Sequence, residues 1–239
     1  MTYDVATGRG MRILDLFCGA GGAAMGLHWA FPKAEIVGVD IKPQPRYPFT
    51  FVRHDALTYP WEGFTFFWAS PPCQRHLRGL NNSPGFVASR FECHIAATRA
   101  RLKNESYCPI PFCIENVPGA PLYWTLKLGG WMFPELKVIR ERWFETNFVV
   151  RQPNHVKPKG LLHKGYLSIA GTGIQKWCND RGYKFGVADA RKAMGIDWMT
   201  RKELSQAIPP SYSRYIGEQF KLSRLGAATP AGSVGKEGG

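Results

Sequence analysis

The chain has 239 residues, of which 44% are hydrophobic and 13% aromatic, and this composition excludes a disordered polymer. The length allows one large core with a small appendage. No apolar run approaches the roughly 20 residues needed to cross a bilayer, and the N-terminus has no apolar signal core. We therefore expect a cytoplasmic protein with no membrane partner. Lys and Arg number 31 against 18 Asp and Glu, and the net charge of +13 favours a nucleic-acid partner over a merely basic surface.

The first 150 residues alternate between apolar runs of strand length and stretches with helical spacing. Residues 1–10 are predicted to be a flexible leader, and 11–150 the main domain. Strands are expected at 12–17, 35–39, 49–54, 65–69 and 111–114, with helices at 23–31 and between 86 and 102. This alternation predicts an α/β fold built on a doubly wound, mostly parallel sheet.

The rest of the chain has a different composition. Residues 151–192 hold nine Lys or Arg against two acids, with glycines and aromatics interspersed, and this indicates a small basic module on the main sheet. Residues 199–222 regain an ordered pattern and are expected to return to the main domain. The tail, 223–239, is small and polar, so we predict that it is disordered.

Ligands of a doubly wound sheet gather at the carboxyl ends of its strands. Asp40, Asp55, Cys73 and Glu115 follow or end predicted strands, and Asp15 lies within the first strand. The sequence therefore predicts a site that brings these side chains together.

The segment Asp15–Gly22 (DLFCGAGG) joins the first strand to the first helix. Its glycines allow a ligand to approach the backbone, and Asp40 follows Gly22 at about the spacing of an acid that binds ribose hydroxyls. A dinucleotide, S-adenosylmethionine and a ligand-free tight turn all fit this pattern.

Cys73 stands behind Pro71 and Pro72 at the end of a predicted strand. The prolines restrict the backbone before the thiol, and Gln74, Arg75 and His76 supply donors and positive charge beside it, which favours a thiolate nucleophile. Cys113 lies inside an apolar run and fits a buried structural role. The spacing of Cys93, His94, Cys108 and Cys113 matches no common zinc pattern, so no metal is expected.

At the end of the neighbouring strand, Glu115 could act as an acid or as a hydrogen-bonding partner of the substrate, or could cap the following segment.

The order DLFCGAGG, VGVD, ASPPCQ, ENVPG and Arg140-Glu141-Arg142 resembles the DNA cytosine-C5 methyltransferases of bacteria and phages. The resemblance covers residues 12 to about 150 and resumes near 205. It implies a Rossmann-like catalytic domain over 11–150 that binds S-adenosylmethionine, a small target-recognition region over 151–198, and double-stranded DNA as the substrate. A monomer is expected.

The resemblance also implies roles for individual residues. Cys73 would be the nucleophile, Glu115 would engage the edge of the base, and Arg142 would support it, with Gln74 and Arg140 beside them. The residues implied for the S-adenosylmethionine site are Phe17, Cys18, Gly19, Gly21, Gly22, Asp40, Ile41, Asp55, Ala56, Pro71 and Gln206. The region 151–198 would recognise a short or loosely specified target, and a restriction endonuclease partner is left open.

The chain departs from the family at two places. Val138 occupies the position of a Gln that usually opens the arginine motif, and Ser205-Gln206 replaces a late Gly-Asn pair, so that Gln206 would substitute for the asparagine amide.

Three other functions remain open. Amino-group DNA methyltransferases carry an aromatic residue where this chain has Cys73. A tRNA cytosine-C5 methyltransferase would share the motifs, although the Cys-Phe-Thr tripeptide typical of such enzymes is absent. A catalytically idle DNA-binding relative would not need Cys73, Glu115 and Arg142 together.

Overall fold

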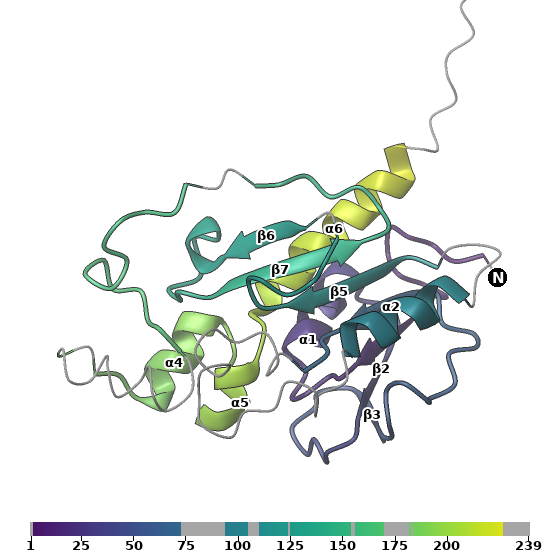
Figure 1. Cartoon of the computed structure of the whole chain (residues 1–239), viewed down its shortest axis with the longest axis horizontal. Helices are drawn as coiled ribbons and strands as arrows, with labels where there is room; N and C mark the ends of the chain where they lie inside the picture. Colours follow the sequence, from purple (N-terminus) through teal and green to yellow (C-terminus); the bar gives the residue numbers. More distant parts are fainter. Residues whose placement is uncertain are drawn as a thin grey trace, which may run out of the picture.

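A seven-stranded sheet forms the centre of the protein in a computed structural model that describes residues 2–72, 94–104, 110–123, 125–153, 156–169, 182 and 184–226 (Figure 1). The strand order is β3-β2-β1-β4-β5-β7-β6, in which β1 to β5 are parallel and β7 is antiparallel to both neighbours. The strands are β1 (Arg12–Leu16), β2 (Glu35–Asp40), β3 (Thr50–Arg53), β4 (Phe66–Ala69), β5 (Phe112–Asn116), β6 (Leu126–Gly129) and β7 (Glu141–Thr146). The predicted doubly wound, mostly parallel sheet is confirmed.

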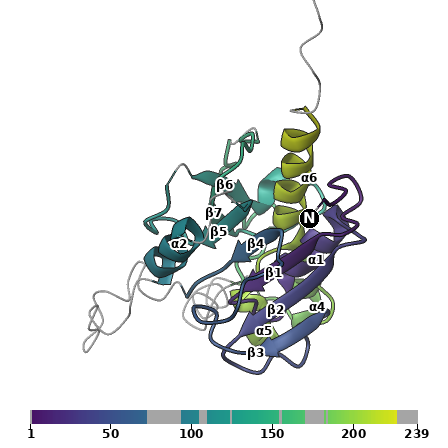
Figure 2. The same ribbon diagram turned by 90° about the vertical axis from the view of Figure 1, so that its right-hand side faces the viewer.

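Helices cover both faces of this sheet. The helical elements are α1 (Gly22–Ala30), α2 (His94–Asn104), the 3-10 turn η3 (Gly130–Met132), α4 (Val187–Met194), α5 (Arg201–Gln206) and α6 (Pro210–Gly226). Figure 2 shows α1 and α6 on one side of the sheet and α2 on the other.

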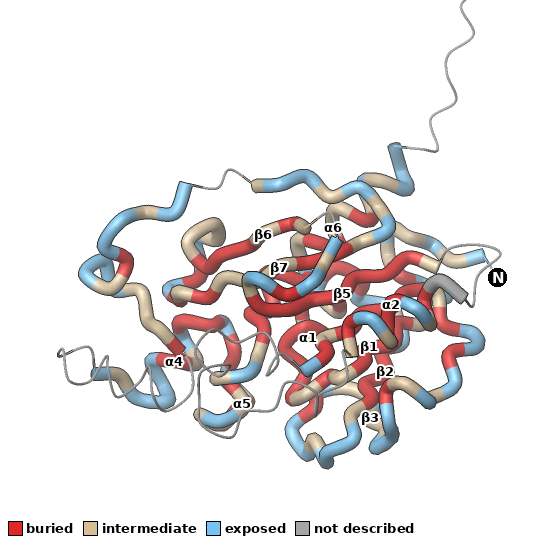
Figure 3. Tube along the Cα trace, viewed as in Figure 1, coloured by how far each residue is buried: buried red, intermediate tan, exposed pale blue. Residues whose placement is uncertain are grey.

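The core consists of two apolar layers, one on each face of the sheet. Successive residues of β1 alternate between them: Ile13 packs in the layer that contains residues of α1 and α6, and Leu14 packs in the layer that contains residues of α2. Because both faces are covered, the central strands are buried almost throughout (Figure 3), and most of their residues are apolar, as is typical of parallel sheets.

Two glycines allow α1 and α6 to approach closely. A Cβ atom at Gly26 would lie 1.9 Å from the carbonyl oxygen of Pro210, and one at Gly217 would lie 2.7 Å from the Cβ of Ala30. This approach holds the C-terminal helix against the helix that follows the glycine-rich loop.

The N-terminus differs from the sequence prediction. In place of a flexible leader, residues 2–10 form hydrogen-bonded turns, with the N–H of Gly8 donating to Asp4 O (2.8 Å) and that of Lys33 donating to Thr7 O (3.1 Å). A Cβ atom at Gly8 would lie 2.8 Å from the Cβ of Phe31, so this segment packs on the end of α1.

Element boundaries also differ in the second half of the chain. β5 extends through Glu115 to Asn116, and β6 and β7 were not predicted. α2 begins at His94, while residues 86–93 of the predicted helix lie outside the described residues. α6 continues to Gly226, into the predicted tail, of which 227–239 also lie outside the described residues.

Candidate active site

The loop after β1 turns sharply and contains several residues in the left-handed region of backbone conformation. Phe17, Gly19 and Gly21 all have positive φ, at 56°, 50° and 84°. A positive φ costs little for glycine and is unusual for phenylalanine, and such strain tends to occur at functional sites. The Cys18 N–H donates to Val39 O (3.1 Å), which holds the loop against the end of β2.

Asp40, the last residue of β2, holds this loop from the other side. One carboxylate oxygen accepts from the Gly19 N–H (3.1 Å), and the other accepts from the Lys42 N–H (2.9 Å). A carboxylate can accept about four hydrogen bonds, so capacity remains for a ligand. Beside it, Ile41 has a 63% exposed side chain, which gives the same edge an apolar surface.

Two more predicted cofactor residues follow β3. The Asp55 side chain is exposed and accepts from the Leu57 N–H (2.9 Å), whereas Ala56 is buried. The structure therefore places Asp40 and Asp55 after adjacent strands, since Asp40 pairs with Arg53 in the sheet.

Residues 198–208 contact the glycine-rich loop. The Trp198 indole N–H donates to Ala20 O (2.8 Å), and a Cβ atom at Gly22 would lie 2.3 Å from Ile208 O. Gln206, which ends α5, is exposed two residues before Ile208. The predicted cofactor residue thus lies close in sequence to the segment that touches the loop.

Asp15 lies in β1, just before the glycine-rich loop. Its side chain is fully buried; one oxygen accepts from the Tyr47 hydroxyl (3.1 Å), and the other finds no partner in the part of the chain that the structure describes. Burial raises the pKa of Asp15 from 3.8 to about 8, against the opposing hydrogen bond from Tyr47. Asp15 is therefore mostly protonated at neutral pH.

Replacing Asp15 with Asn is expected to remove a pH dependence of stability. Between the unfolded pKa of 3.8 and the folded pKa of about 8, the native state retains a proton that the unfolded chain has released. The free energy of unfolding of the parent protein therefore falls as pH rises through this window. Urea unfolding should find Asp15→Asn more stable than the parent at pH 8 and similar to it near pH 4. An identical pH dependence in both proteins would contradict a neutral Asp15.

A second group of polar residues lies at the ends of β4, β5 and β7. Arg142 Nε is 2.9 Å from Glu115 Oε1, and the side chains of both residues are largely buried. Burial raises the pKa of Glu115, and this effect exceeds the lowering by Arg142 and by a hydrogen bond with Ser70. A raised pKa favours a carboxyl group that can donate a proton, while Arg142 supplies adjacent positive charge.

Arg140 binds the backbone of three residues from other segments. Its guanidinium donates to the carbonyl oxygens of Ile169, Ser205 (3.1 Å) and Ala207 (2.6 Å). These bonds join the start of β7 to the basic region and to α5, so the observed role of Arg140 is to hold these segments together.

Neither cysteine in the described segments is suited to be a nucleophile. Burial, followed by the charges of Asp15 and Asp40, raises the pKa of Cys18, and burial also raises that of Cys113 well above its ordinary value. Reactive cysteines require the opposite shift. Cys73 and Gln74 lie outside the described residues, as do Cys93 and Cys108.

Val138, which departs from the family's arginine motif, lies in the core. Its side chain is fully buried, and its backbone forms a parallel bridge with Leu167. This position therefore packs the protein interior and presents no side chain to a substrate.

Sequence reasoning missed the tertiary partners of the site. Tyr47 reaches Asp15 because Gly38 of β2 leaves space: a Cβ atom there would lie 2.2 Å from the Tyr47 ring. A glycine within an apolar strand is the only local signal of such a close approach. Ser70 and Asn116 stand within recognised motifs but were given no role of their own.

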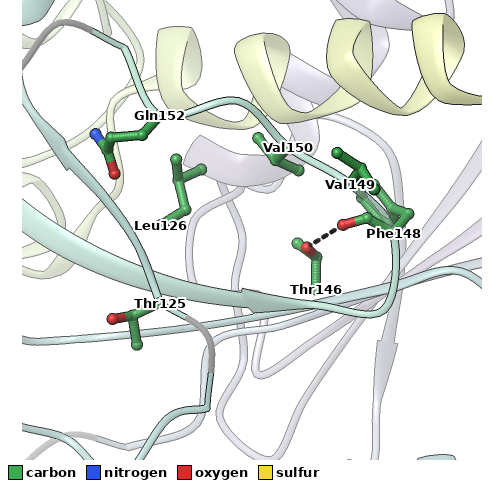
Figure 4. A pocket seen from close by; sticks show the side chains of 7 residues that line it. All are labelled: Thr125, Leu126, Thr146, Phe148, Val149, Val150 and Gln152. Atoms are coloured by element: carbon green, nitrogen blue, oxygen red, sulfur yellow. Dashed lines mark hydrogen bonds between the residues drawn. The ribbon is translucent and has the colours of Figure 1, made fainter.

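A cavity of about 250 Å³ lies apart from these residues, beside β6 and β7 (Figure 4). Thr146, at the opposite end of β7 from Arg142, lines it and donates its hydroxyl to Phe148 O (2.8 Å). The remaining lining residues are Thr125, Leu126, Val149, Val150 and Gln152. The cavity is not part of the candidate site.

Membrane-spanning helices and metal-binding clusters are both absent from the part of the chain that the structure describes. No helix there is long and apolar enough to cross a membrane. Within the same ranges, no group of three or more His, Cys, Asp or Glu side chains is placed to hold a metal ion.

No family model and no curated protein matches the chain. Among solved structures, the S. pombe Dnmt2 methyltransferase is 16% identical, with a TM-score of 0.57, over 92% of this chain and 100% of its own. An RNA methyltransferase from Salinibacter ruber, in complex with S-adenosyl-L-homocysteine, is 15% identical over 66% of this chain and 90% of its own, with a TM-score of 0.36. The first similarity shows that this chain has a Rossmann-like fold, and the second is too weak to add to that conclusion.

Proposed function

We propose that this protein is a DNA cytosine-5 methyltransferase that uses S-adenosylmethionine and a covalent bond to Cys73. The observation that carries the proposal is the buried Glu115–Arg142 pair (2.9 Å) at the carboxyl end of β5, beside β4, whose end leads through Pro71 and Pro72 into Cys73. In open α/β sheets, ligands bind at the point where strand order reverses, which here lies between β1 and β4.

The residues on the β1 side fit S-adenosylmethionine. A Cβ atom at Gly19 would meet no atom of the described residues within 4 Å, so these residues leave space beside the loop backbone. The Asp40 carboxylate has capacity for ribose hydroxyls, and the exposed Ile41 offers an apolar surface to an adenine ring. When bound, S-adenosylmethionine supplies an electrophilic methyl group.

The residues on the β4 and β5 side fit an attack on cytosine. Carbon 5 of the ring is a weak nucleophile, and addition of the Cys73 thiolate to carbon 6 makes it electron-rich. Negative charge then develops on the ring, where Glu115 can protonate nitrogen 3 and Arg142 can stabilise the carbonyl oxygen. After methyl transfer, water takes the proton from carbon 5, Cys73 leaves as a thiolate, and nitrogen 3 returns its proton to Glu115. A cytosine within a duplex must first flip out, at a cost of a few kcal/mol.

The basic region supports a polyanionic substrate. The side chains of Lys157, Lys159, Lys164, Lys184 and Lys192 are exposed. Exposed lysines can neutralise phosphates and release counterions, which is the sequence-independent part of nucleic-acid affinity. These lysines support a nucleic-acid partner, and the motif resemblance favours duplex DNA.

Methyl transfer from labelled S-adenosylmethionine tests the proposed function. The two substrates are duplex DNA of mixed sequence context and tRNA at equal nucleotide concentration. Label in 5-methylcytosine of DNA supports the proposal. Label in tRNA alone would assign the same chemistry to RNA, and label in neither would support an idle relative.

Replacing Asp40 with Ala is expected to weaken S-adenosylmethionine binding. The change removes the carboxylate that binds the Gly19 and Lys42 amides and would bind the ribose. Loss of hydrogen bonds to a charged group costs about 1.5–3 kcal/mol each, or at least about tenfold in Kd by calorimetry. Asp4→Ala, which removes a carboxylate from the N-terminal turns, is the matched control. Unchanged affinity in folded Asp40→Ala would remove this residue from the site.

A further inference from the structure

We propose that Asn116 is a positioning residue. Its side-chain amide fixes the backbone of Pro71, two residues before Cys73, and so helps to position the proposed nucleophile. This inference rests on the proposed function. Asn116 is the last residue of β5, next to Glu115, and is 1% exposed. Asn116 thus links Pro71, which precedes Cys73, to β5, the strand that carries Glu115.

Both ends of the Asn116 amide are bound. Nδ2 donates to Pro71 O (2.9 Å), and Oδ1 accepts from the Val117 N–H (3.0 Å). Because a carbonyl can only accept and an amide N–H can only donate, these partners fix the orientation of the side chain. The side chain therefore joins the segment after β4 to the segment after β5.

The two prolines explain why a side chain is needed here. The Ser70 N–H donates to Leu16 O (3.0 Å) and is the last backbone donor before Cys73, because Pro71 and Pro72 have no N–H. Sheet-type hydrogen bonding through backbone donors therefore stops at Ser70. A carbonyl is the remaining backbone group through which Pro71 can be held, and Asn116 binds it.

This contact lies beside a second link between the same strands. Ser70 hydrogen-bonds Glu115, while Pro71 is bound by the next residue of β5, Asn116. Adjacent residues of a strand point to opposite faces, so β5 holds the end of β4 on both faces of the sheet. The two links fix Ser70 and Pro71, which precede Cys73 in the chain, relative to the acid that would act on the same base.

Replacing Asn116 with Asp tests the amide directly. The side chain keeps its shape, but an ionised carboxylate cannot donate to Pro71 O. A displacement of about 1 Å in a catalytic group can cost about 100-fold in rate, so we expect kcat to fall about 10- to 100-fold. KM for S-adenosylmethionine and for DNA should stay within about threefold, because the proposed binding residues are untouched.

Asn147 provides a matched control at the other end of β5. Its Oδ1 accepts from the Phe112 N–H (2.8 Å), and its Nδ2 donates to Ile110 O (2.9 Å). Asn147→Ala therefore removes a pair of bonds of the same kind, remote from Glu115. We expect this variant to retain the parent kcat.

The decisive measurement is the rate at which each variant forms a covalent adduct with 5-fluorocytosine duplex DNA in the presence of S-adenosylmethionine. We expect slow trapping by Asn116→Asp and parent rates for Asn147→Ala. The ratio of the Asn116→Asp rate to the parent rate should rise as pH is lowered, because a protonated carboxyl can again donate to Pro71 O. If Asn116→Asp does not fold, Asn116→Ser, whose hydroxyl is too short to reach both partners, is judged by its trapping rate.

The outcomes are distinguishable. Parent-like trapping by a folded Asn116 variant, or equal losses in the Asn116 and Asn147 variants, overturns the positioning role while leaving the proposed function intact. Absence of an adduct in the parent protein overturns the proposed function, and the positioning role with it.

Discussion

Replacing Glu115 with Gln is expected to slow methyl transfer by about 10²- to 10⁴-fold, the usual contribution of a general acid. Glutamine can donate a hydrogen bond to the ring but cannot transfer a proton. Because burial raises the pKa of Glu115, the parent rate should also fall as pH rises through this raised pKa. Single-turnover transfer of labelled methyl to duplex DNA measures both effects.

The change also leaves the buried Arg142 without its carboxylate partner, so folding must be checked by circular dichroism and by S-adenosylmethionine binding. Glu35→Gln is the matched control, because Glu35 begins β2 and pairs with Arg12 at the amino ends of the strands, away from the candidate site. A folded Glu115→Gln variant that transfers methyl within about threefold of the parent rate would remove Glu115 from the chemistry.

Replacing Arg99 with Met is expected to destabilise the protein by about 3–5 kcal/mol, because it leaves a buried charge unpaired. Arg99 of α2 donates through Nε and Nη2 to the two carboxylate oxygens of Glu145 in β7 (2.8 and 2.6 Å) and through Nη2 to Pro121 O (2.8 Å). Both side chains of the pair are less than 10% exposed, at 9% and 6%. This ion pair fixes α2 on the sheet, so its loss should shift urea unfolding strongly.

The double variant Arg99→Met, Glu145→Leu separates charge from packing. It removes both charges and should recover most of the lost stability, since a buried pair is often replaced by apolar groups at little cost. A double variant no more stable than Arg99→Met would contradict the unpaired charge as the cause. If Arg99→Met lowers the free energy of unfolding by less than about 1 kcal/mol, the pair stabilises the protein no more than an ordinary surface ion pair does.

The fold was predictable where local pattern and tertiary environment agree. β1, β2 and β4 are apolar runs because both sheet faces are covered, and their lengths identify them as strands. β6 is only Leu126–Gly129 and includes a lysine and a glycine, so no local signal separates it from a loop. Residues 2–10 have a composition typical of flexible segments, and their order depends on packing against Phe31, which is distant in sequence.

The candidate site was predictable where a polar residue ends a strand. Asp40 and Glu115 stand out because a carboxylate at the end of an apolar run is unusual, and the sheet brings strand ends to one edge. The bonds between Tyr47 and Asp15 and between Asn116 and Pro71 depend on how separate segments meet in space. Those pairings have no periodicity along the chain, so the sequence alone could not reveal them.

Covalent trapping on 5-fluorocytosine tests the central claim most directly. Fluorine at carbon 5 permits thiol addition and methyl transfer but prevents the final elimination, so the Cys73–carbon 6 bond should persist. With mixed-context duplex DNA and S-adenosylmethionine, we expect a denaturation-resistant adduct that mass spectrometry maps to Cys73. Cys73→Ser should abolish it, because a hydroxyl without a strong base is a far poorer nucleophile than a thiolate. Entry of labelled methyl into cytosine of ordinary DNA, without an adduct on the fluorinated duplex, would contradict thiol addition by this protein.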